Sequence, residues 1–315
     1  MARKLIIVLA VFAAFLGSSC GGGGFAFPFF GIIVVDRGND RIVFIQNALG
    51  LGWDTYGGFG TGTNQFDSPS DVARDSLGRY YFIDTLNNRI VRVDDLNGTN
   101  WTEFGTFGTG DGQFDTPFGI AIDSLDQIYV ADTGNNRITR VNSLFNIGTW
   151  EDFGALGNGI GEFTAPEDVH IDGAGRIVVA DTGNSRIVQF TTMTGTGWTA
   201  FGGGNFQNPA GVATDTFDRI YVADTNNNRI VRMDAIDGSN FTPFGMVGTG
   251  TNEFQEPTRV YLDTANFLYV ADTDNARIVK FNGMNGFGWT AFGTAGAGVG
   301  NFSVPRAAFP LIESP

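Results

Sequence analysis

The sequence predicts an all-β fold, a six-bladed β-propeller whose blades are four-stranded antiparallel sheets. Three observations lead to it: a polar motif repeated six times, aromatic landmarks repeated in the same order, and two end fragments that together make one blade. The composition agrees, because 46 Gly, 30 Phe and only 17% charged residues among 315 suit a turn-rich, strand-rich globule. A single all-β domain can reach this length.

The polar motif Asp-x-x-Asn-x-Arg recurs at intervals of 48, 48, 49, 43 and 48 residues. Each Arg follows its own Asp by five residues, so we interpret the pairs as ties across the turn between the second and third strands, rather than as an anion-binding ring. The pairs are Asp36 and Arg41, Asp84 and Arg89, Asp132 and Arg137, Asp181 and Arg186, Asp224 and Arg229, and Asp272 and Arg277.

Two aromatic landmarks recur with the motif. An aromatic-x-x-aromatic-Gly pattern starts at Trp53, Trp101, Trp150, Trp198, Phe241 and Trp289, and a Phe-x-x-Pro pattern ends at Pro69, Pro117, Pro166, Pro209, Pro257 and Pro305. Aromatic residues that recur once per unit are expected to pack in the core or between blades.

The unit around residue 130 shows how four strands follow one another. Strand-length segments at 120–123, 128–132, 137–141 and 150–153 are separated by turns. The run Tyr221-Val-Ala and its equivalents are apolar on both faces, as expected for sheets that lie between neighbouring sheets. Four antiparallel strands in about 40–50 residues are typical of a propeller blade.

The two ends of the chain are each incomplete. A second strand at 31–35 has no first strand before it, and the segment 302–309 begins like a blade that never follows. We therefore expect the C-terminal segment to become the innermost strand of the first blade, which closes the ring over residues 31–315.

The segments 130–138 and 222–230, with the sequences VADTGNNRI and VADTNNNRI, closely resemble NHL repeats, and the resemblance covers residues 31–309. It implies a binding or scaffolding module, although a minority of related propellers are lyases. Fold alone does not choose between these functions.

Residues 1–19 are predicted to be a signal peptide. Arg3 and Lys4 precede twelve apolar residues, 5–16, which are too few to cross a bilayer of about 30 Å as a helix. The segment 16–20 resembles a bacterial lipoprotein box ending at Cys20, although Leu16 is four residues before the cysteine where that pattern has three. The alternative is an ordinary cleavage site beside an incidental cysteine.

If Cys20 carries the lipid, residues 20–30 form a Gly- and Phe-rich tether. Phe25, Phe27, Phe29 and Phe30 either rest at the membrane interface or cover the first blade. We thus expect an exported, membrane-anchored lipoprotein on the periplasmic or cell-surface side, secreted if Cys20 is not lipidated. The membrane would be contacted through the anchor only.

Several function classes are disfavoured by composition. A net charge of −14 without a basic run lacks the surface that nucleic acids require. His170 is the only histidine, which excludes a His-rich zinc site, and the Gly-rich loops precede strands rather than the helix N-termini that bind phosphate. No cofactor is expected.

Candidate ligand-binding residues lie where the repeats disagree, just after each Pro, at the expected rim of the central channel. Carboxylates fall on one side of this ring and arginines on the other, and the loop 201–209 before the rim is five residues shorter than its counterpart at 104–117. The candidates are Asp71, Glu167, Asp168, His170, Arg259, Tyr261 and Arg306. Either they hold a polar ligand or peptide end, or their charges pair across the channel.

The sequence thus favours a non-enzymatic binding or scaffold propeller tethered to the bacterial envelope, with a protein, peptide or glycan partner. The alternative is a propeller-type lyase or hydrolase with Ca²⁺ or Mg²⁺ held by Asp71, Glu167 and Asp168.

Overall fold

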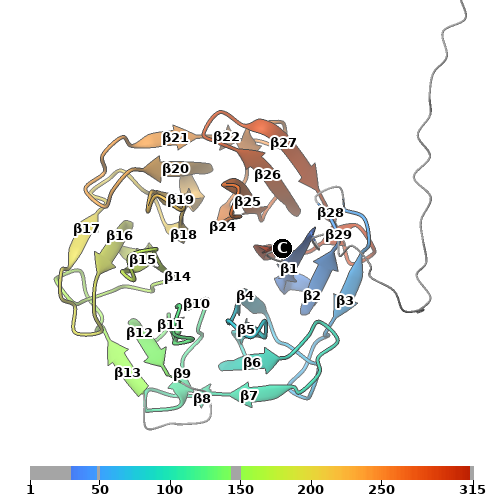
Figure 1. Cartoon of the computed structure of the whole chain (residues 1–315), viewed down its shortest axis with the longest axis horizontal. Helices are drawn as coiled ribbons and strands as arrows, with labels where there is room; N and C mark the ends of the chain where they lie inside the picture. Colours follow the sequence, from blue (N-terminus) through green and yellow to red (C-terminus); the bar gives the residue numbers. More distant parts are fainter. Residues whose placement is uncertain (1–29, 48–49, 143–149, 313–315) are drawn as a thin grey trace, which may run out of the picture.

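Six four-stranded antiparallel sheets stand around a central axis in the computed structural model, which describes residues 30–47, 50–142 and 150–312 (Figure 1). Each sheet is one blade, and its strands follow one another from the axis to the outside. The predicted six-bladed β-propeller is confirmed. The predicted signal peptide, Cys20 and most of the tether lie outside the described residues.

The blades follow the chain in order, and the first combines its two ends. Blade 1 contains β30 (Pro305–Ile312), β1 (Phe30–Asp36), β2 (Arg41–Ile45) and β3 (Asp54–Tyr56). Blade 2 contains β4 (Pro69–Arg74), β5 (Tyr80–Asp84), β6 (Arg89–Val93) and β7 (Thr102–Phe104). Blade 3 contains β10 (Gly119–Ile122), β11 (Ile128–Asp132), β12 (Arg137–Val141) and β13 (Trp150–Phe153).

The remaining blades repeat this pattern. Blade 4 contains β14 (Asp168–Ile171), β15 (Ile177–Asp181), β16 (Arg186–Phe190) and β17 (Thr199–Phe201). Blade 5 contains β18 (Pro209–Thr214), β19 (Ile220–Asp224), β20 (Arg229–Met233) and β21 (Thr242–Phe244). Blade 6 contains β24 (Pro257–Leu262), β25 (Phe267–Asp272), β26 (Arg277–Asn282) and β27 (Phe287–Phe292).

Short parallel pairs lie in the Gly-rich loops between blades. They are β8 (Thr106–Phe107) with β9 (Gln113–Phe114), β22 (Met246–Val247) with β23 (Glu253–Phe254), and β28 (Thr294–Ala295) with β29 (Asn301–Phe302). These loops are therefore ordered connections, and they pack against the turn of the following blade.

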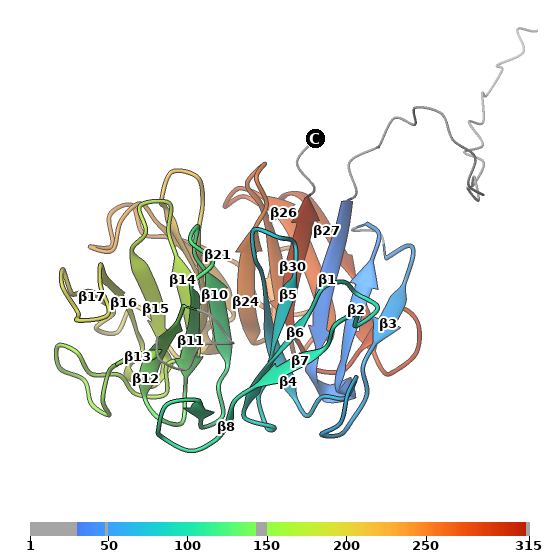
Figure 2. The ribbon, with the colours of Figure 1, turned by 60° about the horizontal axis from the view of Figure 1, so that its bottom comes forward.

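Ring closure follows the prediction from the chain ends. The C-terminal strand β30 pairs antiparallel with β1, from Phe30 opposite Ile312 to Asp36 opposite Pro305, and the two strands run side by side in Figure 2. Because this pairing joins the first and last segments of the chain, the ring has no free sheet edge at its seam.

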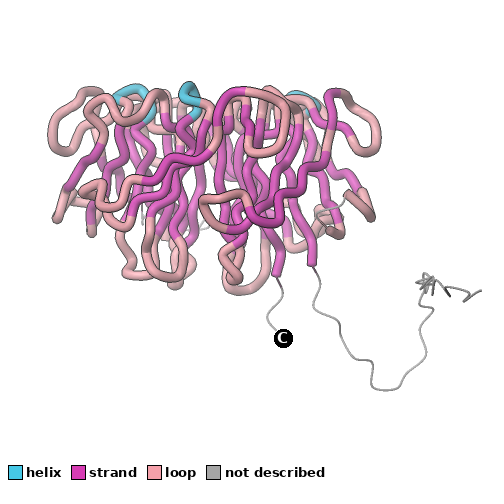
Figure 3. Tube along the Cα trace, turned by 90° about the horizontal axis from the view of Figure 1, so that it is seen from above, coloured by secondary structure: helices cyan, strands magenta, loops and turns pink. Residues whose placement is uncertain are grey.

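The two faces of the ring are different. On one face lie the motif turns, three of which form the short 3-10 helices η1 (Arg37–Asn39), η3 (Thr182–Asn184) and η4 (Thr225–Asn227), seen at the top of Figure 3. Strand β1 begins and β30 ends at the opposite face. The chain therefore enters the ring on the side away from the motif turns.

The core lies between the blades. The Phe of each Phe-x-x-Pro pattern is buried, with at most 4% of its surface exposed, and it packs against the first aromatic residue of the neighbouring landmark. For example, the ring centroids of Phe114 and Trp150 are 5.3 Å apart. In the described part of the chain, no helix is long and apolar enough to cross a membrane.

Candidate functional site

In all six blades the motif Arg forms an ion pair with its own Asp. The Arg Nε lies 2.7–2.8 Å from an Oδ2 atom of its own Asp, and each Asp is fully buried. In blade 3, Arg137 also donates to the carbonyls of Thr109 and Gln113, at 2.8 and 3.0 Å. Each pair thus ties its own turn to the Gly-rich loop before it.

The second oxygen of each motif Asp is also used. Oδ1 of Asp132 accepts a hydrogen bond from the Asp115 N–H at 2.8 Å. Burial raises the pKa of Asp132, against the bonds from Asn135, the Asp115 N–H and Arg137, which lower it. A fully buried carboxylate whose two oxygens both accept hydrogen bonds within one blade and its connecting loop is not accessible to a ligand.

The short loop changes this network in blade 5. Arg229 reaches one carbonyl of that loop, Asn205 O at 2.7 Å, and its side chain is 24% exposed where the other motif arginines are 7–14% exposed. Shortening the loop therefore leaves this ion pair less enclosed.

The residue two positions after each landmark Pro alternates around the ring between charged and small. In blades 1 to 6 the residues are Ala307, Asp71, Gly119, Asp168, Gly211 and Arg259. From the sequence, the carboxylates were predicted to lie on one side of the ring and the arginines on the other. In the ring they stand on alternate blades, so the three charged side chains meet in the channel.

Arg259 crosses the channel and faces both carboxylates. Its Nε lies 3.6 Å from Asp71 Oδ2 and 3.7 Å from Asp168 Oδ1, and these side chains are only 2–6% exposed. The guanidinium donates hydrogen bonds to the carbonyls of Ala210 and Glu167, and the Tyr261 hydroxyl donates to Asp71. We call Asp71, Asp168, Arg259 and Tyr261 the channel cluster.

The aspartates of the channel cluster also join neighbouring blades. Asp71 Oδ2 accepts from the Ile120 N–H at 2.9 Å, and Asp168 Oδ2 accepts from the Val212 N–H at 2.8 Å. These contacts need small neighbours, because a Cβ on Gly119 would lie 2.8 Å from Asp168 Oδ1. The alternation of charged and small residues is thus a packing requirement.

The channel cluster holds two carboxylates and one guanidinium, so its charges do not balance. Burial raises the pKa of Asp71. The pKa of Asp168 is about 7, because burial and the nearby Asp71 charge raise it more than the Arg259 charge lowers it. Because removing a charge from water is costly, one proton is readily retained in this cluster.

The cluster divides the channel into two spaces. The mouth pocket, on the face of the motif turns, has a volume of about 270 Å³. The chamber, toward the opposite face, measures about 190 Å³ and has mainly apolar walls. Glu167 and Arg306 line the mouth pocket, whereas His170 and Tyr261 line the chamber.

In the chamber, small residues alternate with large ones. Ala73, Ala121 and Ala213 leave the space that His170, Tyr261 and Phe309 surround. His170 Nε2 lies 3.0 Å from Thr214 Oγ1, and burial lowers its pKa to about 4, so the imidazole is neutral at pH 7. The chamber therefore carries no cationic imidazole.

The mouth holds a residue that the sequence analysis missed. Arg37 follows the motif Asp in the first repeat, and its guanidinium lies 5.0 Å from the Phe118 ring centroid. Arg306 lies over the same ring at 5.3 Å. The signal was visible, because the residue after the motif Asp is Thr in the other five repeats: Thr85, Thr133, Thr182, Thr225 and Thr273.

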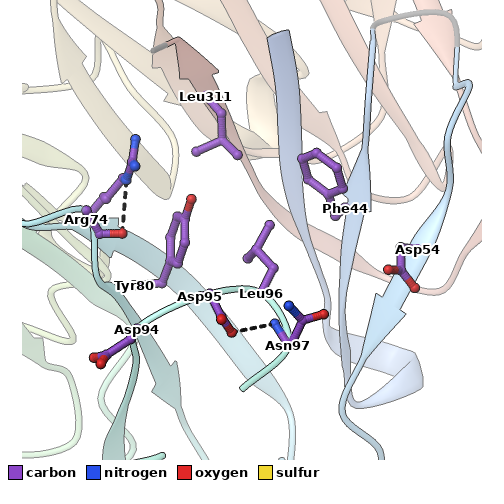
Figure 4. Close-up of a pocket in the computed structure, with 10 residues that line it drawn as sticks. Phe44, Asp54, Arg74, Tyr80, Asp94, Asp95, Leu96, Asn97 and Leu311 are labelled. Atoms are coloured by element: carbon purple, nitrogen blue, oxygen red, sulfur yellow. Dashed lines mark hydrogen bonds between the residues drawn. The ribbon is translucent and has the colours of Figure 1, made fainter. Parts of the chain in front are cut away.

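A larger cavity, about 390 Å³, lies between blades 1 and 2 and was not predicted (Figure 4). Apolar side chains and carboxylates surround it: Phe44, Tyr80, Leu96, Leu311, Asp54, Asp94 and Asp95. Arg74 donates to the Gly78 carbonyl at 3.2 Å and stacks on the Tyr80 ring at 5.3 Å.

Among the residues that the structure describes, no group of three or more His, Cys, Asp or Glu is arranged to hold a metal ion. The three carboxylates considered for Ca²⁺ or Mg²⁺ do not converge: Asp71 and Asp168 face Arg259, while Glu167 lies at the mouth near Arg306.

Comparison with known families identifies the repeat. Four segments match the NHL repeat, at residues 114–140, 163–190, 206–233 and 254–281. The chain therefore contains NHL repeats. Each match starts at the Phe of a Phe-x-x-Pro pattern and ends in the third strand of the blade that follows, in blades 3 to 6. A comparison with curated proteins found no match.

Solved structures with the same fold include lyases and a protein complex. A streptogramin B lyase is 14% identical, with a TM-score of 0.60 over 84% of this chain and 82% of that one. Virginiamycin B lyase from Staphylococcus aureus is 19% identical, with a TM-score of 0.58 over 84% and 83%. A nidogen/laminin complex is 16% identical, with a TM-score of 0.63 over 80% and 89%.

The TM-scores show that this chain shares its fold with those proteins, but the sequence identities are low. They carry no activity from one protein to another. Function has to be argued from the channel and its mouth.

Proposed function

We propose that this NHL-repeat propeller is a non-enzymatic binding or scaffold module of a bacterial cell envelope, anchored through a lipid on Cys20, which takes its ligand at the mouth pocket. One observation carries the proposal: the mouth and the entry of the chain lie on opposite faces of the ring. A ring tethered by its N-terminal segment would present the mouth away from the membrane.

The length of the tether is compatible with this arrangement. Nine residues separate Cys20 from Phe30, and four of them are the glycines 21–24. At full extension such a segment reaches roughly 35 Å. The ring would thus stay near the membrane while its mouth remains accessible to soluble or surface partners.

The chemistry of the mouth supports binding rather than catalysis. The two carboxylates of the channel cluster, Asp71 and Asp168, are shielded beneath the mouth and already accept backbone hydrogen bonds. A general base or metal ligand needs a lone pair that faces the substrate. The lyase or hydrolase alternative therefore has less support from the geometry than the binding module has.

Site-specific photo-crosslinking in cells tests the proposal. A photoreactive amino acid replaces Asn226, which lines the mouth pocket, or Thr264, which is exposed at the opposite end of the channel, as the matched control. We expect the full chain in the membrane fraction, with a defined envelope adduct from position 226 and none from position 264. Cys20→Ala should release the chain from the membrane.

Identical adducts from both positions would overturn the location of the binding site. A rise in melting temperature of several degrees with Ca²⁺ or Mg²⁺, abolished by Asp168→Asn, would instead support the metal-dependent enzyme.

A further inference from the structure

Two arginines from blade 1 meet at the mouth. Arg37 comes from η1, and Arg306 is the second residue of β30. Both guanidiniums lie within 5.0–5.3 Å of the Phe118 ring centroid, contributed by blade 3. The two arginines therefore share one aromatic support and one side of the mouth.

Arg37 is not required by the architecture of the repeat. In four other repeats the Thr at this position donates to a proline carbonyl of the next blade at 2.7–2.9 Å. Thr85 instead donates to Ser70 Oγ at 2.8 Å. A Thr at position 37 could make the same kind of bond, so the arginine is a departure that blade stability does not explain.

Arg306 lacks the partners that the motif arginines have. Its Nε is buried and has no hydrogen-bond partner within the described part of the chain, although the side chain as a whole is 17% exposed. The nearest carboxylate oxygen, Glu167 Oε2, lies 3.9 Å from its Nη2, beyond hydrogen-bond distance. A buried N–H without a hydrogen-bond partner is costly unless an acceptor completes it.

The electrostatics of the mouth point the same way. Burial lowers the pKa of Arg306 to about 10, and the neighbouring Arg37 and Arg259 charges lower it further, while Glu167 and Glu256 oppose them. Burial also lowers the pKa of Arg37. Both guanidiniums would thus be stabilised by an added negative charge.

The other walls of the mouth pocket present acceptors. The hydroxyls of Thr182 and Thr225, two residues of the pocket wall, already donate their protons to proline carbonyls, so they can serve a ligand only as acceptors. Glu256 and Asp274 add carboxylates. None of the twelve residues that line the pocket is aromatic, so it lacks a ring on which a sugar could stack.

We propose that the mouth pocket binds the free C-terminal carboxylate of a peptide, with Arg306, which lines the pocket, as its direct contact and Arg37, which lies beside Arg306 outside the lining, as a second positive charge. This assignment rests on the proposed function and names its ligand class. The planar fork of a guanidinium matches a carboxylate, and the acceptor wall matches the amide N–H groups that precede it.

The volume of the pocket limits what enters. About 270 Å³ is slightly below the range of roughly 300–1,000 Å³ that drug-sized ligands occupy. One or two terminal residues fit into such a space. The rest of the peptide lies outside the ring and contributes little to recognition by this pocket.

Calorimetric titration of the full chain in detergent tests the assignment. The probes are N-acetyl-trialanine with a free carboxylate, the same peptide with a C-terminal amide, and inorganic phosphate. We expect the free acid to bind at least tenfold more tightly than the amide, and phosphate to bind more weakly than the free acid.

Variants assign the contacts. Arg306→Ala should weaken binding of the free acid by tenfold or more, and Arg37→Thr should weaken it several-fold. Arg37→Thr should fold like the wild type, since five repeats already carry Thr there. Arg232→Ala, which removes a charge on β20 beside Asp234, is the control and should leave the affinity unchanged.

Equal affinity for the acid and the amide, or an equal loss in Arg232→Ala, would overturn the assignment. Phosphate binding as tight as that of the free acid would reassign the mouth to small anions. If these titrations fail while position 226 still crosslinks one partner, the ligand class is wrong and the binding module stands. Failure of both removes the proposed function.

Discussion

The motif pairs and the channel cluster use the same residue types for different tasks. In each motif pair one arginine meets one aspartate at 2.7–2.8 Å, and both are completed by atoms of the same blade or the loop beside it. In the channel cluster one arginine serves two aspartates at 3.6 and 3.7 Å, from blades on different sides of the ring. Each motif pair joins nearby segments and has one positive and one negative charge. The channel cluster joins distant segments and has one positive charge for two carboxylates.

This difference distinguishes the residues that recur in every repeat to stabilise it from the residues that differ between repeats. The motif pairs recur because every blade needs the same turn held against the same loop. The channel cluster cannot recur, because six copies of either charge would repel one another at the axis. Four predictions sharpen the contrast.

Arg259→Met has the largest expected effect, because it leaves two buried carboxylates without a cation. Removing one partner of a buried charge cluster costs about 3–5 kcal/mol. Chemical denaturation at pH 8 measures this loss. Arg232→Met is the control: its Nε lies 3.7 Å from Asp234 but the pair is 25–36% exposed, so about 1 kcal/mol or less is expected. Equal losses would contradict the special role of the channel.

Gly119→Ala tests the alternation of charged and small residues. A Cβ there would lie 2.8 Å from the Asp168 Cα, which is backbone and cannot easily move, so a loss of about 1–3 kcal/mol is expected. Gly58→Ala is the matched control, since nothing lies within 4 Å of a Cβ at that position. Thermal unfolding of the two variants compares them directly, and similar melting temperatures would argue against a packing requirement.

Arg137→Lys and Arg229→Lys compare an enclosed motif pair with the one beside the short loop. A lysine cannot keep the bonds to both Asp132 and the loop carbonyls, so Arg137→Lys should cost about 2 kcal/mol. Arg229→Lys should cost about half as much, because only the Asn205 carbonyl is lost. An unchanged melting temperature for Arg137→Lys would remove the structural role of the pairs.

The pH dependence of stability tests the charge on the channel cluster, and per pH unit it is the smallest of these effects. The folded-state pKa of Asp168, about 7, lies above its ordinary value of 3.8, so the folded chain binds more protons between these pH values. The contribution of Asp168 to stability therefore falls as pH rises from about 4 to 7, by about 1 kcal/mol per pH unit at the steepest. Asp168→Asn should flatten this slope, and Asp111→Asn, which changes an exposed side chain, is the control.

The fold could be read from the sequence because its contacts repeat at short range. The Asp132–Arg137 pair spans five residues, and the carbonyls that Arg137 reaches lie 24 and 28 residues before it. Such contacts fall within one repeat and return at each interval. The closing strand was also predictable, since the fragments at the two ends complement each other.

The site was only partly predictable. Asp71, Asp168, Arg259 and Arg306 stood out because they break the repeat, but the assignment to two arcs missed that alternate blades face one another across the axis. Arg37 broke the repeat equally clearly, because each of the other five repeats has Thr at this position. The cavity between blades 1 and 2 had no sequence signal, because its lining comes from Phe44, Leu96 and Leu311, which lie far apart in the chain.

By itself, the sequence determined the number of blades, the strand order within each and the partner of every motif arginine, because these depend on spacings of a few tens of residues. Only the tertiary structure decided which charges meet in the channel and that Arg37 and Arg306 share the mouth. Ring closure sets those distances: Tyr261 reaches Asp71 across 190 positions of sequence, and no local pattern encodes that separation.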